Sequence, residues 1–167
     1  THCISSAASD VYKRQRFGFV FARRGIVPEA ASSWFLPRLI GINKALELCY
    51  TGKVISAEEA KEIRLVSEIL NQDKLIDRAL EIAKEFTAES SQISIALTRQ
   101  MMWRMLGADD PMEAHKIDSR AVFELGQSGE AIEGVNSFLE KRPPSFPGKV
   151  SKDMPSFFPW WDEKEFE

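Results

Sequence analysis

Apolar residues recur at three- and four-residue spacings through most of the sequence after residue 41, and this pattern constrains the chain to a mostly helical fold. Residues 42–50 show the pattern first, and Gly52 stands where a helix C-terminus favours glycine. Capping residues then mark helix starts at Ser56, Asp110 and Ser128. Later helices are predicted over residues 56–63, 75–86, 93–107, 110–125 and 128–140.

Some of these helices carry a continuous apolar stripe. The helices over 75–86 and 93–107 are each expected to bury one stripe against the rest of the protein. The last helix carries four apolar side chains on one face. They are Ile132, Val135, Phe138 and Leu139.

One short stretch near the start has strand character. Phe17 to Phe21 is apolar and aromatic, which favours a β-strand, and Gly25 opens a turn after it. A helix is predicted over 30–39, with Pro28 at or just before its first turn and Pro37 ending or kinking it. A lone strand leaves both edges unpaired. The sequence therefore predicts that an upstream part of the fold is missing.

Changes in composition divide the chain into four regions. Residues 1–15 are polar and without periodicity, and the character of the sequence changes abruptly at Arg16, so we interpret 1–15 as a foreign or artefactual segment. Residues 16–70 hold the strand and the first helices, and residues 71–142 form a helical region. Residues 143–167 are an extended tail rich in proline and aromatic residues, expected to pack on another element or subunit.

Charge and cysteine content exclude several functional classes. Lys and Arg total 22 against 25 Asp and Glu, a net charge of -3, so the sequence has no basic footprint for nucleic acid. No apolar stretch approaches the roughly 20 residues of a membrane span. Cys3 and Cys49 lie far apart and form no zinc-binding motif. Two isolated cysteines favour a reducing, cytoplasmic setting.

Glu29 is the first candidate for catalysis. It follows Pro28 at the expected helix start, and apolar residues such as Val27 and Ala30 flank it. Apolar surroundings disfavour a charged carboxylate whereas a helix N-terminus stabilises it, and a carboxylate balanced in this way can act as a base toward a carbon acid. Acidic residues are also common in the first turn of any helix. Spacing alone leaves both interpretations open.

Three motifs between Phe17 and Ile69 carry a family resemblance: FGF, GIVPEAASSWFLPRLIG and AxELCYTGKVISAEEAKEIRLVSEI. Together they resemble the crotonase superfamily, which includes enoyl-CoA hydratases and isomerases. The resemblance implies the C-terminal half of an α/β spiral of ββα turns with a helical trimerisation region. Residues 16–70 would end the core and carry the active-site loop. A homotrimer or hexamer is expected for the full-length protein.

The resemblance also bears on the reaction. Enoyl-CoA hydratases of the family use two glutamates, and Phe21 stands at the position of the second. Glu29 instead matches the acidic residue that some enoyl-CoA isomerases carry four residues after the turn glycine. This favours an isomerase, in which Glu29 removes a proton from C2 of a 3-enoyl-CoA and returns it at C4 through an enolate. Coenzyme A enters as part of the substrate, and no other cofactor is implied.

Two alternatives stay open. A hydratase-type or hydrolase-type relative would run a different reaction on the same scaffold, and a non-catalytic helical fragment would only self-associate or bind protein. In the family, two backbone N–H groups hold the thioester oxygen, and both come from upstream segments. The 167 residues by themselves are therefore expected to be inactive.

Other site residues follow from the resemblance. The run FLEKR resembles the family's final-helix motif, which implies that Lys141 contacts the nucleotide of coenzyme A and that Phe138 lines the adenine pocket. The alternative for Lys141 is a cation that complements a helix C-terminus. Trp34 and Phe21 are expected to wall the acyl pocket, although core packing is the commoner role of aromatics. No metal site is predicted, because His115 has no second His or Cys nearby.

Arg64 departs from the family pattern. The family usually has glycine in this turn, just before residues 65–70, which are expected to be extended. An arginine costs about 1 kcal/mol at this position if the backbone demands a positive φ.

Overall fold

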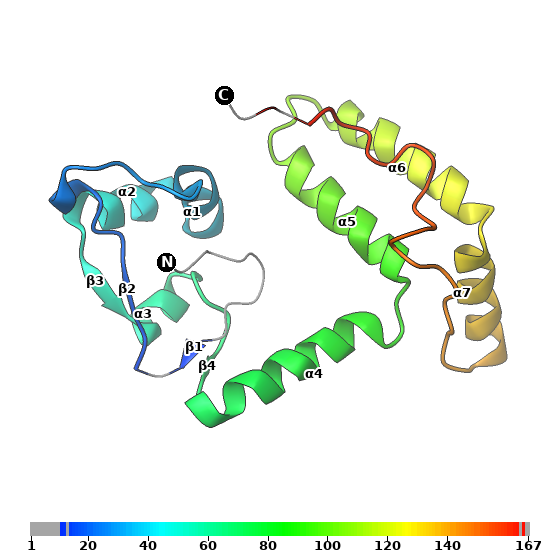
Figure 1. Ribbon diagram of the computed structural model, residues 1–167, viewed down its shortest axis with the longest axis horizontal. Coiled ribbons are helices and arrows are strands. Elements are labelled where there is room, and N and C mark those ends of the chain that lie inside the picture. The colour runs from blue at the N-terminus through cyan, green and yellow to red at the C-terminus, as the bar shows by residue number, and fades with distance from the viewer. Residues whose placement is uncertain (1–10, 13, 164, 166–167) are drawn as a thin grey trace. The chain divides into compact units, whose positions relative to one another are not determined.

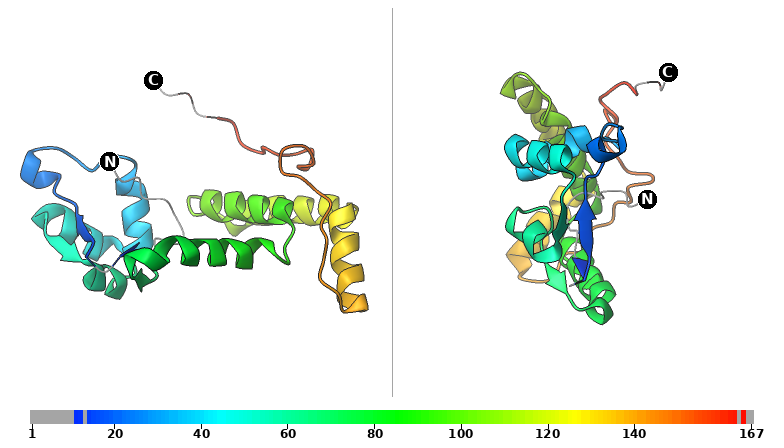
Figure 2. Two further views of the ribbon diagram at one scale, coloured as in Figure 1. Left: turned by 60° about the horizontal axis from the view of Figure 1, so that its bottom comes forward. Right: turned by 90° about the vertical axis from the view of Figure 1, so that its left-hand side faces the viewer.

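The computed structural model describes residues 11–12, 14–163 and 165 (Figure 1). These residues form seven α-helices, two 3-10 helices and four short strands, which confirms that the chain is mostly helical. Backbone contacts divide the chain into two units, residues 1–82 and 83–167. Two further views show the elements of each unit (Figure 2).

The described part of unit 1 contains two pairs of short strands. Strand β2 (Arg16–Gly18) pairs antiparallel with β3 (Val54–Ser56), and Phe17 stands opposite Ile55 in the register. The expected strand over 17–21 ends early, because Phe21 enters the turn of a 3-10 helix, η1. It is also not alone, so the expectation of two unpaired edges is wrong.

A second strand pair joins the beginning and the end of unit 1. Strand β1 (Val11–Tyr12) runs parallel to β4 (Ile69–Leu70). β1 lies inside the segment 1–15 that the sequence sets apart, and residues 1–10 and 13 lie outside the described residues. The foreign origin of 1–15 stays a prediction, as do the four region boundaries.

The helices of unit 1 begin and end where local sequence signals place them, with one exception at α1. Ser56 and Glu59 form the predicted capping box at the start of α3, each side chain accepting the other's backbone N–H. Gly52 ends α2 in a left-handed conformation and donates its N–H to the Leu48 carbonyl. The elements are η1 (Ala22–Arg24), α1 (Ser32–Ile40), α2 (Ile42–Thr51), α3 (Ala57–Glu62), η2 (Gln72–Lys74) and α4 (Leu75–Thr87), the last of which crosses into unit 2.

The core of unit 1 lies between α1, α2, α3 and the β2–β3 pair. Leu36 and Leu48 are its largest fully buried side chains. Its other members are Phe19, Ala45, Ile55, Ala57, Ala60 and Val66. Arg64 follows α3 with a φ of 62°, so the backbone demands the positive φ that the family's glycine would supply.

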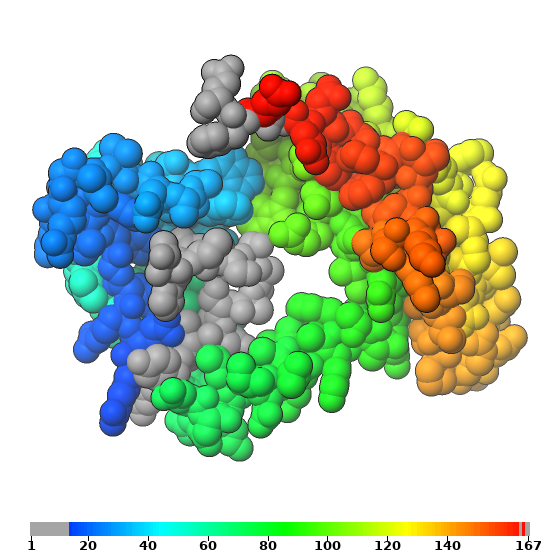
Figure 3. All heavy atoms as spheres, in the orientation of Figure 1, coloured from blue at the N-terminus to red at the C-terminus, as the bar shows by residue number. Residues whose placement is uncertain are grey.

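Unit 2 consists of the end of α4, three capped helices and the tail. The capped helices are α5 (Gln92–Met105), α6 (Pro111–Gly126) and α7 (Gly129–Glu140), capped by Ser91, Asp110 and Ser128. Its buried core comprises Ile93, Leu97, Ala121 and the tail residue Phe157. Figure 3 shows the tail, in orange and red, lying against these helices. The prediction that the tail packs on another element is confirmed.

A buried carboxylate ties the tail to two helix starts. Glu130 is 5% exposed and accepts hydrogen bonds from the Ser91 hydroxyl and from the Gly148 N–H, at 2.7 Å. Its own N–H donates to the Ser128 hydroxyl at 3.2 Å. One residue therefore connects the caps of α5 and α7 with the chain after α7.

The apolar stripes of α4 and α7 are exposed in the described chain. The stripe of α7, from Ile132 to Leu139, has side chains that are 57% to 81% exposed. Helix α4 buries no residue, so the prediction that residues 75–86 bury a stripe is wrong here. Helix α5 does bury its stripe. Periodicity identifies an apolar face but does not specify what covers it.

Candidate functional site

The loop that carries Glu29 runs from Gly25 to the start of α1. Gly25 closes η1 with a φ of 69° and donates its N–H to the Ala22 carbonyl. Residues 26–29 have no regular structure, and Glu29 is exposed. Helix α1 begins at Ser32 rather than at residue 30, so Pro28 does not occupy its first turn. The expectations that Glu29 stands at a helix start and in apolar surroundings are therefore wrong for the described chain.

A tight turn separates Glu29 from α1. Ala30 and Ala31 both have positive φ, 50° and 54°, and the Ser32 N–H donates to the Glu29 carbonyl at 2.9 Å. Positive φ at both central positions is typical of a type I′ turn, which usually contains Asn or Gly. Each alanine costs about 1–2 kcal/mol in this conformation. The carboxylate of Glu29 is thus attached to a strained turn.

Ser32 reinforces this turn. Its hydroxyl donates a second hydrogen bond to the Glu29 carbonyl, at 2.6 Å, and Ser32 is only 4% exposed. The Ala31 carbonyl in turn accepts from the N–H groups of Trp34 and Phe35. The turn is therefore fixed to the first turn of α1, which the buried side chain of Leu36 holds in the core.

Trp34 lies in the first turn of α1 and is half-buried. Its ring stands edge to face with that of Phe35, and the Arg38 guanidinium carbon lies 4.0 Å from its centroid. Arg38 also donates from Nη1 to the Trp34 carbonyl at 3.0 Å. One face of the indole is thus covered by a cation within the same helix. A role for Trp34 in the acyl pocket stays a prediction.

Phe21 occupies the turn after β2. Its ring is half-buried and packs against the core of unit 1. Its carbonyl accepts from the N–H groups of Arg24 at 2.9 Å and Ile26 at 3.1 Å. Nearby, Arg23 donates from Nε to the carbonyl of Thr51. Position 21 therefore carries an apolar side chain in the turn and no carboxylate.

Lys141 and Phe138 lie together at the end of α7, in unit 2. Lys141 is the C-cap residue, with a left-handed φ of 54° and its N–H donating to the Phe138 carbonyl. Both side chains are exposed. The following residue, Arg142, binds the Glu133 carboxylate through two hydrogen bonds of 2.6 and 2.9 Å. The residue after Lys141 is thus a cation held by an ion pair, whereas the side chain of Lys141 is exposed.

Comparison with known proteins identifies the family of the chain. The sequence model described as enoyl-CoA hydratase/isomerase matches residues 8–149. The chain belongs to the enoyl-CoA hydratase/isomerase family. This confirms the resemblance to the crotonase superfamily.

Individual relatives of the family carry different reaction names. The chain is 43% identical over 135 residues to an enoyl-CoA hydratase from Alternaria alternata, covering 80% of this chain and 45% of that protein. It is 29% identical over 140 residues to the 1,2-epoxyphenylacetyl-CoA isomerase of Escherichia coli, covering 80% of this chain and 50% of that protein. The chain spans about half the length of the curated relatives it matches.

The fold of this family member matches solved structures. The crystal structure of an enoyl-CoA hydratase from Bacillus anthracis superposes with a TM-score of 0.76 at 30% identity, covering 83% of this chain and 54% of that one. The chain therefore has the fold of the C-terminal part of a crotonase-type protein, as the sequence predicted.

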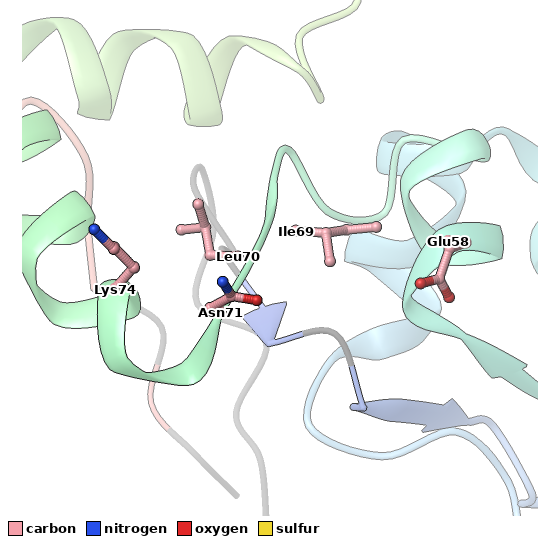
Figure 4. Close-up of a pocket in the computed structure, with 5 residues that line it drawn as sticks. All are labelled: Glu58, Ile69, Leu70, Asn71 and Lys74. Atoms are coloured by element: carbon pink, nitrogen blue, oxygen red, sulfur yellow. The ribbon is translucent and has the colours of Figure 1, made fainter.

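Other features of this family member carry no clear chemistry. A pocket in unit 1 is lined by Glu58, Ile69, Leu70, Asn71 and Lys74, none of them a predicted site residue (Figure 4). In the described residues no group of three His, Cys, Asp or Glu could hold a metal ion. None of the described helices combines the length and apolar character needed to span a lipid bilayer.

The single described cysteine and one histidine have ordinary roles. Burial raises the pKa of the Cys49 thiol, which disfavours the thiolate. His115 is exposed and lies 3.3 Å from an Asp118 oxygen on the same helix.

Ser32 and the two alanines before it were not singled out from the sequence. Ala-Ala carries no signal for a type I′ turn, which normally requires Gly, Asn or Asp. In the sequence, Ser32 is one of four small residues in the run AASS, and nothing there distinguishes it from Ser33. Its partner, the Glu29 carbonyl, is known only once the turn has been placed.

Proposed function

We propose that the protein to which this chain belongs moves a double bond in an enoyl-CoA thioester, with Glu29 as the base. The contrast between two positions supports this proposal. Phe21, where the resemblance expects the second glutamate of hydratases, carries a ring packed against the core. Glu29 carries an exposed carboxylate on a turn that is hydrogen-bonded to the buried Ser32. A single carboxylate suits proton transfer between two carbons of one substrate.

The proposed reaction starts from a 3-enoyl-CoA. The Glu29 carboxylate takes a proton from C2, and the electrons of that C–H bond form the enolate of the thioester. Glu29 then returns the proton to C4, the double bond moves to C2–C3, and the thioester carbonyl is restored. The product is an isomer of the substrate, so the step needs no co-reactant and no cofactor beyond the coenzyme A that the substrate carries.

The enolate oxygen needs hydrogen-bond donors in place before the reaction. By the family resemblance these are two backbone N–H groups outside the 167 residues, and each such donor contributes about 3–4 kcal/mol. We therefore propose that the 167 residues alone do not turn over substrate.

The nucleotide end of the substrate is proposed to bind at the end of α7. Lys141 offers an exposed ammonium for a phosphate, and Phe138, 81% exposed, offers a ring face for adenine. The exposed apolar stripes of α4 and α7 support assembly of the full-length protein into a homotrimer or hexamer.

A second candidate is the hydration of a 2-enoyl-CoA. The relative from Alternaria alternata, an enoyl-CoA hydratase, favours it. In this reaction Glu29 would have to activate water without a partner carboxylate at position 21.

Two substrates separate the candidates. The full-length product of the gene, given a 3-enoyl-CoA, is expected to form the conjugated 2-enoyl thioester, followed by its ultraviolet absorbance. Given a 2-enoyl-CoA, it is expected to form no 3-hydroxyacyl-CoA. Hydration faster than isomerisation would favour the second candidate. Turnover of neither substrate by the folded protein would favour the non-catalytic alternative.

A further inference from the structure

A strained backbone conformation persists only when its surroundings hold it in place. The turn between Glu29 and α1 contains two consecutive alanines with positive φ, 50° and 54°. No side chain in this turn is of the type that favours this conformation. The contacts that hold the turn must therefore come from the residues next to it.

Ser32 supplies those contacts. Its N–H and its hydroxyl both donate to the carbonyl of Glu29, at 2.9 and 2.6 Å. Ser32 is 4% exposed, so water does not compete strongly for either bond. The neighbouring Ser33 has the same side chain but is exposed. The two serines thus differ in what their hydroxyls reach.

From these contacts we infer that Ser32 is a positioning residue for Glu29. The two hydrogen bonds fix the peptide plane that follows the α-carbon of Glu29, and so fix the direction of its side chain relative to α1. Helix α1 is itself anchored in the core through Leu36. Ser32 touches no substrate in this account and acts only through Glu29. The inference rests on the proposed function.

The test is a set of variants of the full-length gene product, assayed with a 3-enoyl-CoA. Ser32→Ala removes only the hydroxyl bond, and we expect kcat to fall about ten- to a hundredfold, because small misplacements of a reacting group carry losses of this order. KM should change far less. Ser33→Ala removes the same hydroxyl one residue later and should leave both constants unchanged.

A double-mutant cycle separates positioning from a general structural effect. In the Glu29→Gln background, Ser32→Ala should lower the remaining rate no further, because the group that it positions is gone. A further loss equal to that in the wild type would overturn the inference. Ser32→Cys keeps the shape of the side chain but puts a larger atom and a weaker donor in place of the hydroxyl, so it should give the same loss of kcat even if Ser32→Ala does not fold.

The outcomes distinguish failure of the positioning role of Ser32 from failure of the proposed function of Glu29. Full activity of Glu29→Gln would overturn both. A large loss in Glu29→Gln together with unchanged kcat in Ser32→Ala and Ser32→Cys would overturn the role of Ser32 alone.

Discussion

The carboxylate of Glu133 and the guanidinium of Arg142 form a two-point ion pair, with Oε1 2.6 Å from Nη1 and Oε2 2.9 Å from Nη2. The backbone N–H of Ser145 donates to the same carboxylate, so the pair also holds the chain that leaves α7. Hydrogen bonds lower the pKa of Glu133 from 4.5 to about 2. The bonds from Arg142 have the largest effect, and the bond from the Ser145 N–H has the next largest.

This pair predicts a pH dependence of stability. Because the pKa of Glu133 is lower in the folded protein, its contribution is complete above pH 4.5 and is lost as the pH falls toward 2. The variant Glu133→Gln should therefore lose less stability than the wild type across this window, measured as Tm against pH. Glu89→Gln, which removes an exposed carboxylate from a loop, should keep the wild-type slope. Parallel curves for Glu133→Gln and the wild type would contradict the assignment.

A side chain at Gly148 is expected to destabilise the protein. A Cβ there would meet the Ile93 Cδ1 atom and would lie 2.6 Å from Oε1 of Glu130, both in the buried part of unit 2. Gly148→Ala should lower the free energy of unfolding by about 1–3 kcal/mol, because overpacking forces its neighbours to move. Chemical denaturation measures this loss.

Gly126 provides the matched control for Gly148. A Cβ at Gly126, the last residue of α6, would meet nothing within 4 Å. Gly126→Ala should be neutral or should stabilise by up to about 1 kcal/mol, because alanine restricts the unfolded chain. Equal losses in the two variants would show that the space around Gly148 is not the cause.

Arg64 is a site where glycine should stabilise the protein. Arg64 has a φ of 62°, and relief of this conformation is worth about 1–2 kcal/mol, offset by about 0.5–1 kcal/mol of glycine's extra freedom in the unfolded chain. The net gain in Arg64→Gly is expected to be about 0–1.5 kcal/mol by denaturant unfolding. Lys61→Gly, within the helix α3, should destabilise instead. A loss of stability in Arg64→Gly would contradict the strain argument.

Helix positions were the part of the fold that local sequence predicted best. The capping box of Ser56 and Glu59, the Asp110 cap and the Gly52 stop act within one helical turn, so the sequence alone contains both partners of each interaction. The strands were harder to predict. Val54–Ser56 is three residues long and forms a strand only because Phe17 lies opposite Ile55, a contact distant in sequence.

The role of Glu29 stays a prediction, and its surroundings differ from those expected. Glu29 stood out because the family resemblance marked its position. Pro28 suggested that a helix starts there, yet α1 begins at Ser32 because a turn of two alanines comes between. Small apolar residues give no sign of such a turn. The buried Glu130 was likewise unmarked, because its partners Ser91 and Gly148 come from distant segments.

The central claim is that Glu29 moves the proton between C2 and C4, and the turnover of a 3-enoyl-CoA by Glu29→Gln tests it most directly. In the full-length gene product, with folding checked by its melt, kcat should fall by a factor of about 10² to 10⁴, the usual contribution of a general base. The control Glu62→Gln, at the exposed end of α3, should keep wild-type turnover. Wild-type turnover in Glu29→Gln would contradict the account and leave Glu29 as an ordinary carboxylate in the loop before α1.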